Sequence, residues 1–137
     1  MTQVLQYLFV YGTLRRDQTS LINHPLLADC IYIGEARIGA ELYEVDRYPA
    51  AIAAESGFVT GELYRLPNPE QTLAMLDIYE ECAAQFQAPH EYARSQHPVI
   101  LPGQQPLSAW TYLYNRPIDG LSRIRSGDYC HNPLENS

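Results

Sequence analysis

Short segments with the composition of β-strands recur along the chain, whereas only one stretch has the periodicity of a helix. Apolar, β-branched and aromatic residues alternate or run together at 7–11, 30–45, 58–66, 92–101 and 108–114. The second of these segments is long enough for two strands, with a bend near Gly34 or Gly39. Roughly six strands in one small domain leave two unpaired edges unless the sheet curls, so the pattern predicts a sheet that closes into a barrel.

The one clear helix is expected within NPEQTLAMLDIYEEC, which starts at Asn68. Asn68 is a good N-cap, Pro69 suits the first helical position, and Gln71 follows three residues after the cap. An apolar stripe with helical spacing then follows, formed by Leu73, Leu76 and residues 78–79.

Length and charge limit the classes of protein to which the chain can belong. Its 137 residues fit one domain, expected to span 1–137 with a frayed tail at 130–137. A formal net charge of −7 argues against a nucleic-acid binder and against docking on an acidic membrane. No apolar run approaches the roughly 20 residues of a membrane helix, and the first residues do not resemble a signal peptide. Residues 21–28 are a weaker candidate for a second short helix, because Pro25 interrupts them.

The three cysteines are widely spaced and form no CxxC motif. Cys30, Cys82 and Cys130 are therefore expected to be free thiols in a reducing, cytoplasmic setting. The histidines, at positions 24, 90, 97 and 131, show no metal-ligand spacing, so the sequence indicates no metal site.

Two glutamates stand where the helix is expected to end. Glu80 and Glu81 meet the negative end of the helix dipole, and Asp77 lies one turn earlier. The helix dipole and like charge together are expected to raise the pKa of a carboxyl group here, toward the range of a general base. The alternative is a solvated acidic turn, and two adjacent side chains do not face one pocket, so only one of them is a catalytic candidate.

The segment LFVYGTLRRD, residues 8–17, passes from a buried strand into a glycine, a hydroxyl and two cations. Gly12 permits backbone geometry in which successive N–H groups form a nest for a carboxylate or an oxyanion. Thr13 adds a hydroxyl, and Arg15 and Arg16 add positive charge. A plain turn with solvated arginines is the alternative, and the spacing matches neither a GxGxxG nor a Walker motif.

Taken together, these segments resemble the γ-glutamyl cyclotransferase-like (AIG2-like) family. The resemblance runs over residues 8–129 and rests on five motifs in the family's order: FVYGTLRRDQTSLINHPLL, YPAAI, TGELYRL, LDIYEE and RIRSGDY. It implies an α+β fold, a small mixed β-barrel with a few short helices and a pocket at one opening.

The resemblance also implies the site residues. The backbone of the YGTL turn cradles the substrate in this family, which corresponds to Tyr11, Gly12, Thr13 and Leu14. The family's acid/base glutamate corresponds to Glu80. Many members have glycine directly after this glutamate, whereas this chain has Glu81, which leaves open whether activity or substrate has changed. The usual aromatic residue before the base is present as Tyr79.

The reaction implied is an intramolecular cyclisation. The α-amino group of a γ-glutamyl amine or amide attacks its own γ-carbonyl, giving 5-oxoproline and a free amine without metal or organic cofactor. Two alternatives stay open: a related γ-glutamylamine lyase, and a binding module with the same pocket but no turnover. The expected partner is a small γ-glutamyl molecule; the leaving group and the oligomeric state are not indicated.

Three aromatic residues receive weaker predictions. Tyr48 and Tyr114 are candidates for lining the pocket, with packing in the core or at its rim as the alternative, and Trp110 is expected in the core.

Overall fold

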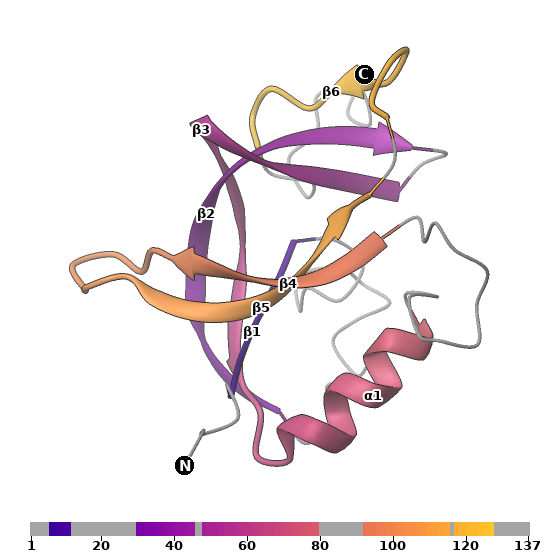
Figure 1. Cartoon of the computed structure of the whole chain (residues 1–137). Coiled ribbons are helices and arrows are strands. Elements are labelled where there is room, and N and C mark those ends of the chain that lie inside the picture. Colours follow the sequence, from indigo (N-terminus) through magenta and orange to yellow (C-terminus); the bar gives the residue numbers. More distant parts are fainter. Residues whose placement is uncertain (1–5, 12–29, 46–47, 80–91, 116, 128–137) are drawn as a thin grey trace.

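The computed structural model describes residues 6–11, 30–45, 48–79, 92–115 and 117–127 (Figure 1). Within these ranges the chain forms six strands and one helix. In chain order they are β1 (Tyr7–Val10), β2 (Ile31–Val45), β3 (Tyr48–Arg65), α1 (Pro69–Tyr79), β4 (Tyr92–Val99), β5 (Leu107–Tyr114) and β6 (Ser122–Arg123).

The six strands form one mixed sheet in the order β4-β5-β1-β3-β2-β6. β1 and β5 run parallel, and the other neighbouring pairs are antiparallel. The sheet curls, with the long β2–β3 hairpin bending behind β4 and β5 in Figure 1. After β4, Ile100 exchanges two backbone hydrogen bonds of 3.0 and 2.8 Å with Arg37 of β2, which connects the two sides of the curl. The expected mixed barrel is therefore confirmed as a half-barrel, and the described residues include one short helix rather than several.

β2 continues as one strand where the sequence suggested two. Its register against β3 shifts between Tyr32 and Gly34 and again between Gly39 and Ala40. A bulge bends a strand without ending its pairing, so the two glycines produce the expected bends inside a single element.

β3 begins at Tyr48, well before the strand expected at 58–66. Its first half pairs with the end of β2 to complete the hairpin. The alanine-rich stretch at 50–54 has few of the β-branched and aromatic residues that mark strands, so its strand character comes from pairing rather than from local preference.

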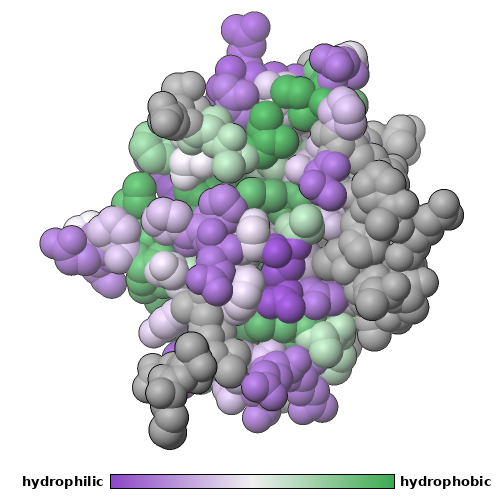
Figure 2. Space-filling model, in the orientation of Figure 1, coloured by the Kyte–Doolittle hydropathy of each residue, from purple (hydrophilic) through white to green (hydrophobic). Residues whose placement is uncertain are grey.

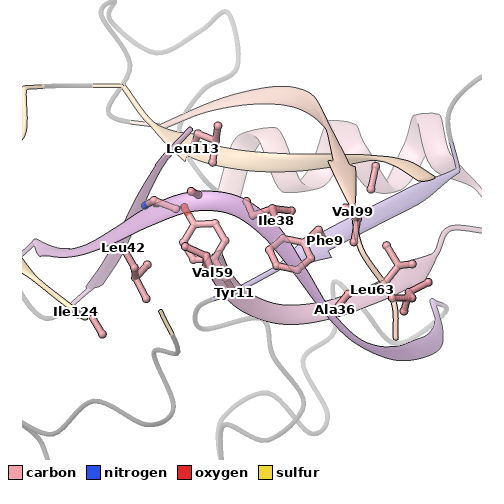
Figure 3. Packing of buried hydrophobic residues seen from close by; sticks show 14 residues of the cluster. Phe9, Tyr11, Ala36, Ile38, Leu42, Val59, Leu63, Val99, Leu113 and Ile124 are labelled. Carbon is pink, nitrogen blue, oxygen red and sulfur yellow. Dashed lines mark hydrogen bonds between the residues drawn. The ribbon is translucent and has the colours of Figure 1, made fainter. Parts of the chain in front are cut away.

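The main hydrophobic core fills the inner face of the half-barrel (Figure 3). The rings of Phe9 and Tyr11 stack with centroids 6.4 Å apart among the side chains of this cluster. Its buried members are Phe9, Tyr11, Ala36, Ile38, Ala40, Leu42, Ala51, Val59, Leu63, Val99, Leu101, Ala109, Leu113 and Ile124.

A second cluster lies between the sheet and α1. Leu8 and Val10 face it from β1, whereas Phe9 faces the inner core, so β1 is buried on both faces as its continuous apolar run suggests. From α1, Leu73 and Leu76 complete this cluster with exposed fractions of 4% and 0%.

α1 begins where its capping residues predict. The backbone N–H of Thr72 donates to the carbonyl of Asn68 at 3.0 Å, and Pro69 is the first helical residue. The apolar stripe is confirmed at Leu73 and Leu76; the weaker candidate helix at 21–28 lies outside the described residues. In the described part of the chain, no helix has both the length and the apolar character needed to span a membrane.

Gly61 allows β1 and β3 to approach closely. A Cβ atom added at this position would lie 2.6 Å from Cζ of Phe9 and would also meet the carbonyl oxygen of Val10. Only glycine fits this contact.

The segment that follows β5 packs back on the hairpin. The N–H of Ile124 donates to the carbonyl of Leu42 at 2.7 Å, and the N–H of Thr60 donates to the carbonyl of Gly127 at 2.6 Å. Gly127 has a φ of 69°, which favours glycine. In Figure 1 this segment lies near the end of the β2–β3 hairpin, away from α1.

The face of the molecule that carries β4 and β5 is largely polar. Figure 2 shows hydrophilic residues across its middle, with hydrophobic residues above and below. β4 is an edge strand in the sheet order, and polar side chains on an edge strand disfavour pairing with a second sheet.

Candidate active site

Most residues predicted for the site lie outside the described part of the chain. Gly12, Thr13, Leu14 and Glu80 all fall there, and so does the second glutamate of the pair. Tyr11 is described, and the helix that leads to Glu80 is described up to its last turn. The structure therefore describes the residues that lead into the two site segments.

Tyr11, directly before Gly12, anchors the end of β1 inside the half-barrel. Its side chain is buried, with 6% of its surface exposed. Its hydroxyl donates to the backbone carbonyl of Tyr112 at 2.5 Å and accepts from the N–H of Ala51 at 3.3 Å. These contacts hold the side chain in the core.

Asp77, in the last turn of α1, is held by two side chains of the sheet. Arg94 of β4 donates to its carboxylate through Nε at 2.7 Å and through a second guanidinium nitrogen at 3.1 Å. The hydroxyl of Tyr112 of β5 donates to the same carboxylate at 2.6 Å. The guanidinium of Arg94 also lies 4.4 Å from the ring centre of Trp110.

Tyr112 therefore contacts both segments that precede the predicted site residues. Its hydroxyl binds Asp77, three residues before Glu80, and its backbone carbonyl binds Tyr11, one residue before Gly12. The carboxyl end of α1 and the carboxyl end of β1 are thus attached to one residue of β5. Tyr11 and Asp77, which precede the two predicted site segments, thus share one partner residue.

The ion pair changes one step of the sequence reasoning. Asp77 was expected to add like-charge repulsion and so to raise the pKa of the neighbouring glutamate. In the structure the carboxylate of Asp77 is instead paired with Arg94, so its charge is offset. Arg94 and Tyr112 were not singled out from the sequence, because nothing local links a strand residue to a helix residue.

A second acidic group, Glu62, is buried beside the end of β1. It is 4% exposed, accepts a hydrogen bond from the hydroxyl of Tyr64 at 3.0 Å, and lies opposite Val10 in the β1–β3 ladder. The sequence analysis missed it, although a carboxylate inside the apolar strand segment TGELYRL was a detectable signal.

One family of known proteins matches most of the chain. The family described as gamma-glutamyl cyclotransferase, AIG2-like matches residues 8–131. The chain belongs to this family.

Individual relatives match more than half of this chain. The gamma-glutamylcyclotransferase family protein YtfP of Escherichia coli K12 is 39% identical over 124 residues, 89% of this chain and 94% of that protein. A gamma-glutamylaminecyclotransferase of Mus musculus is 33% identical over 95 residues, 61% of this chain and 60% of that protein. The solution NMR structure of YtfP from Escherichia coli is 33% identical and superposes with a TM-score of 0.62, covering 93% of this chain and 98% of that one.

The structure also describes some of the aromatic residues and histidines that the sequence analysis considered. Tyr114 packs edge-on against Tyr92 with ring centres 5.6 Å apart, and the side chain of Tyr48 lies outside the description. Trp110 is partly buried against the second cluster rather than fully in the core. Burial lowers the pKa of His97, whose Nε2 lies 3.0 Å from Oγ of Ser95.

The described residues include no group of three or more His, Cys, Asp or Glu that could hold a metal ion. Cys30 is not in a disulfide and lies half-buried beside the second cluster, and the other two cysteines lie outside the described residues.

Proposed function

We propose that the chain is a γ-glutamyl cyclotransferase-type enzyme that converts a γ-glutamyl amine or amide into 5-oxoproline and a free amine. Its family and the names of its relatives support this reaction class. The observation that carries the proposal is the double attachment at Tyr112, which holds the segment before Glu80 and the segment before Gly12.

The proposed base is Glu80. The substrate's ammonium first loses a proton to the carboxylate of Glu80, because only the free amine has a lone pair for attack. The amine nitrogen then attacks the γ-carbonyl carbon and closes a five-membered ring. The attack leaves the ring nitrogen with two hydrogens and a positive charge. As the original amide bond breaks, this nitrogen gives up its second proton, and the departing nitrogen takes up two protons, one of them returned by Glu80, and leaves as an ammonium. The products contain all the atoms of the substrate, so the reaction requires no oxidant, reductant or added water.

The proposed cradle is formed by Tyr11, Gly12, Thr13 and Leu14. Backbone N–H groups here would bind the α-carboxylate of the substrate or the oxyanion that develops on the γ-carbonyl oxygen. The anchoring of Tyr11 in the core supports this role, since preorganised donors need no rearrangement during the reaction. The ring closure is intramolecular, so holding the reactive conformer supplies much of the rate increase.

The test is the rate of 5-oxoproline release by wild type and by Glu80→Gln, with γ-glutamyl amino acids and γ-glutamyl amines as substrates. Glu80→Gln keeps the shape and removes the basic oxygen, so turnover should fall at least ~100-fold. Glu81→Gln is the matched control and should keep most of the activity.

Two results would contradict the proposal. Near-wild-type turnover by Glu80→Gln would remove this residue from the base role. Thermal stabilisation of the wild type by 5-oxoproline, with no product from any substrate of the panel, would support the binding module instead.

A further inference from the structure

We propose that Arg94 is a positioning residue for catalysis: through Asp77 it fixes the end of α1 that presents Glu80. The inference rests on the proposed function and extends it to a residue on a strand that contributes nothing to the predicted cradle. The geometry has three parts, namely the ion pair, the stacking on Trp110 and the shared contact with Tyr112.

The ion pair is forked and partly shielded from water. Two nitrogens of Arg94 reach the carboxylate of Asp77 at 2.7 and 3.1 Å, and the two side chains are 26% and 20% exposed. The guanidinium also rests against the ring of Trp110 at 4.4 Å. Arginine can stack and form two parallel hydrogen bonds at once, whereas the single ammonium of lysine cannot reproduce both.

The last turn of α1 needs this support from outside the helix. The helix has no basic residue in its last turn, where a cation would offset the partial charge of the free carbonyl groups. Asp77 adds a further negative charge to the same end. Arg94, from β4, supplies the missing positive charge.

Within the side chains of α1 that the structure describes, which end at Asp77, the apolar packing comes first. Leu73 and Leu76 are the members of α1 in the second hydrophobic cluster, and Asp77 follows them. Among the side chains that the structure describes, the polar contacts of Asp77 are thus the last attachment of α1 to the sheet before Glu80.

The same attachment extends to the cradle. Tyr112 donates to Asp77 through its hydroxyl and accepts from Tyr11 through its carbonyl, so it also fixes the residue before Gly12. A shift of Asp77 would change the spacing between base and cradle. A displacement of about 1 Å at a reacting group can cost ~100-fold in rate.

The experiment measures kcat and KM for 5-oxoproline release by wild type, Arg94→Met, Arg94→Lys and Tyr112→Phe. Arg94→Met should lower kcat ~10- to 100-fold while KM stays within ~2-fold, because the binding cradle is intact and the base is displaced. Arg94→Lys should recover part of the lost kcat. Tyr112→Phe should act in the same direction, and its combination with Arg94→Met should be less than additive, since both act on Asp77.

The chain offers a matched control in Arg123→Met. Arg123 also approaches a carboxylate, Glu41, that accepts from a tyrosine, Tyr43, but these residues lie on β2 and β6. This variant should leave kcat and KM unchanged. An unchanged kcat in Arg94→Met, or an equal loss in Arg123→Met, would overturn the proposal.

Amide hydrogen exchange without substrate separates this inference from the proposed function. Arg94→Met should raise exchange in the last turn of α1 at least ~10-fold while Thr72 and Leu73 keep their protection. If the wild type releases no 5-oxoproline, the proposed function fails and the exchange data still test the attachment. Unchanged exchange in the last turn would overturn it.

Discussion

Two clusters of this protein contain the same three chemical groups in different settings. In one, Asp77 binds Arg94 and Tyr112 and joins a helix to the sheet. In the other, Glu41 binds Tyr43 at 3.1 Å and approaches Arg123 at 3.8 Å within one side of the sheet.

The two clusters differ in geometry and exposure. The first has two short nitrogen–oxygen contacts and an arginine that is 26% exposed, whereas the arginine of the second is 45% exposed. An exposed pair gains little free energy because water screens it, while a shielded, forked pair holds its partners in place. The residue types alone therefore do not show which cluster holds a helix or strand in place. The packing around each cluster determines this.

The largest expected contrast comes from replacing each arginine by methionine. Arg94→Met should lower the free energy of unfolding by about 2 kcal/mol, between the values for exposed and fully buried pairs, because it leaves the carboxylate of Asp77 without its cation. Arg123→Met should change it by less than about 0.5 kcal/mol. Urea denaturation of the two variants measures both values. Equal losses would remove the distinction between the clusters.

A smaller contrast is expected for the two tyrosine hydroxyls. Tyr112→Phe removes a hydrogen bond to a carboxylate from a buried residue and should cost about 1.5 kcal/mol. Tyr43→Phe removes a comparable bond nearer the surface and should cost about 0.5 kcal/mol or less. The same denaturation series applies, and a larger loss for Tyr43→Phe would reverse the comparison.

The smallest effect is a pH dependence that belongs to the Glu41 cluster. Burial, and then the hydrogen bond to Glu41, raise the pKa of Tyr43 above its usual value. The folded state therefore favours the neutral phenol, and this contribution to stability is complete below pH ~10 and is lost as pH rises through the folded-state pKa. Between about pH 9 and pH 11, wild type should lose slightly more stability than Tyr43→Phe. Thermal melts across that range measure the difference, and parallel curves would contradict it.

Capping residues, an apolar run and glycines in the sequence predicted the start of α1, the position of β1 and the bends of β2. Asn68 and Pro69 marked the start of α1, and the apolar run before Gly12 marked β1. Gly34 and Gly39 marked the bends of β2, although not that the strand continues through them.

Contacts between distant residues could not be predicted in this way. The ion pair of Asp77 with Arg94 depends on how α1 lies against β4. The parallel pairing of β1 with β5 joins two strands that are far apart in the sequence. The alanine-rich half of β3 is a strand only because β2 pairs with it. For the site itself, Glu80 and the Gly12 turn came from resemblance to a family, and their roles stay predictions.

The parallel pairing of β1 with β5 has a consequence for the growing polypeptide. β1 lies between β3 and β5, and Tyr11 reaches across 101 positions of sequence to Tyr112. A ribosome adding roughly 5–20 residues per second needs several seconds to cover that span. During that interval one edge of this apolar strand lacks its neighbour, which a chain built from successive hairpins would supply sooner.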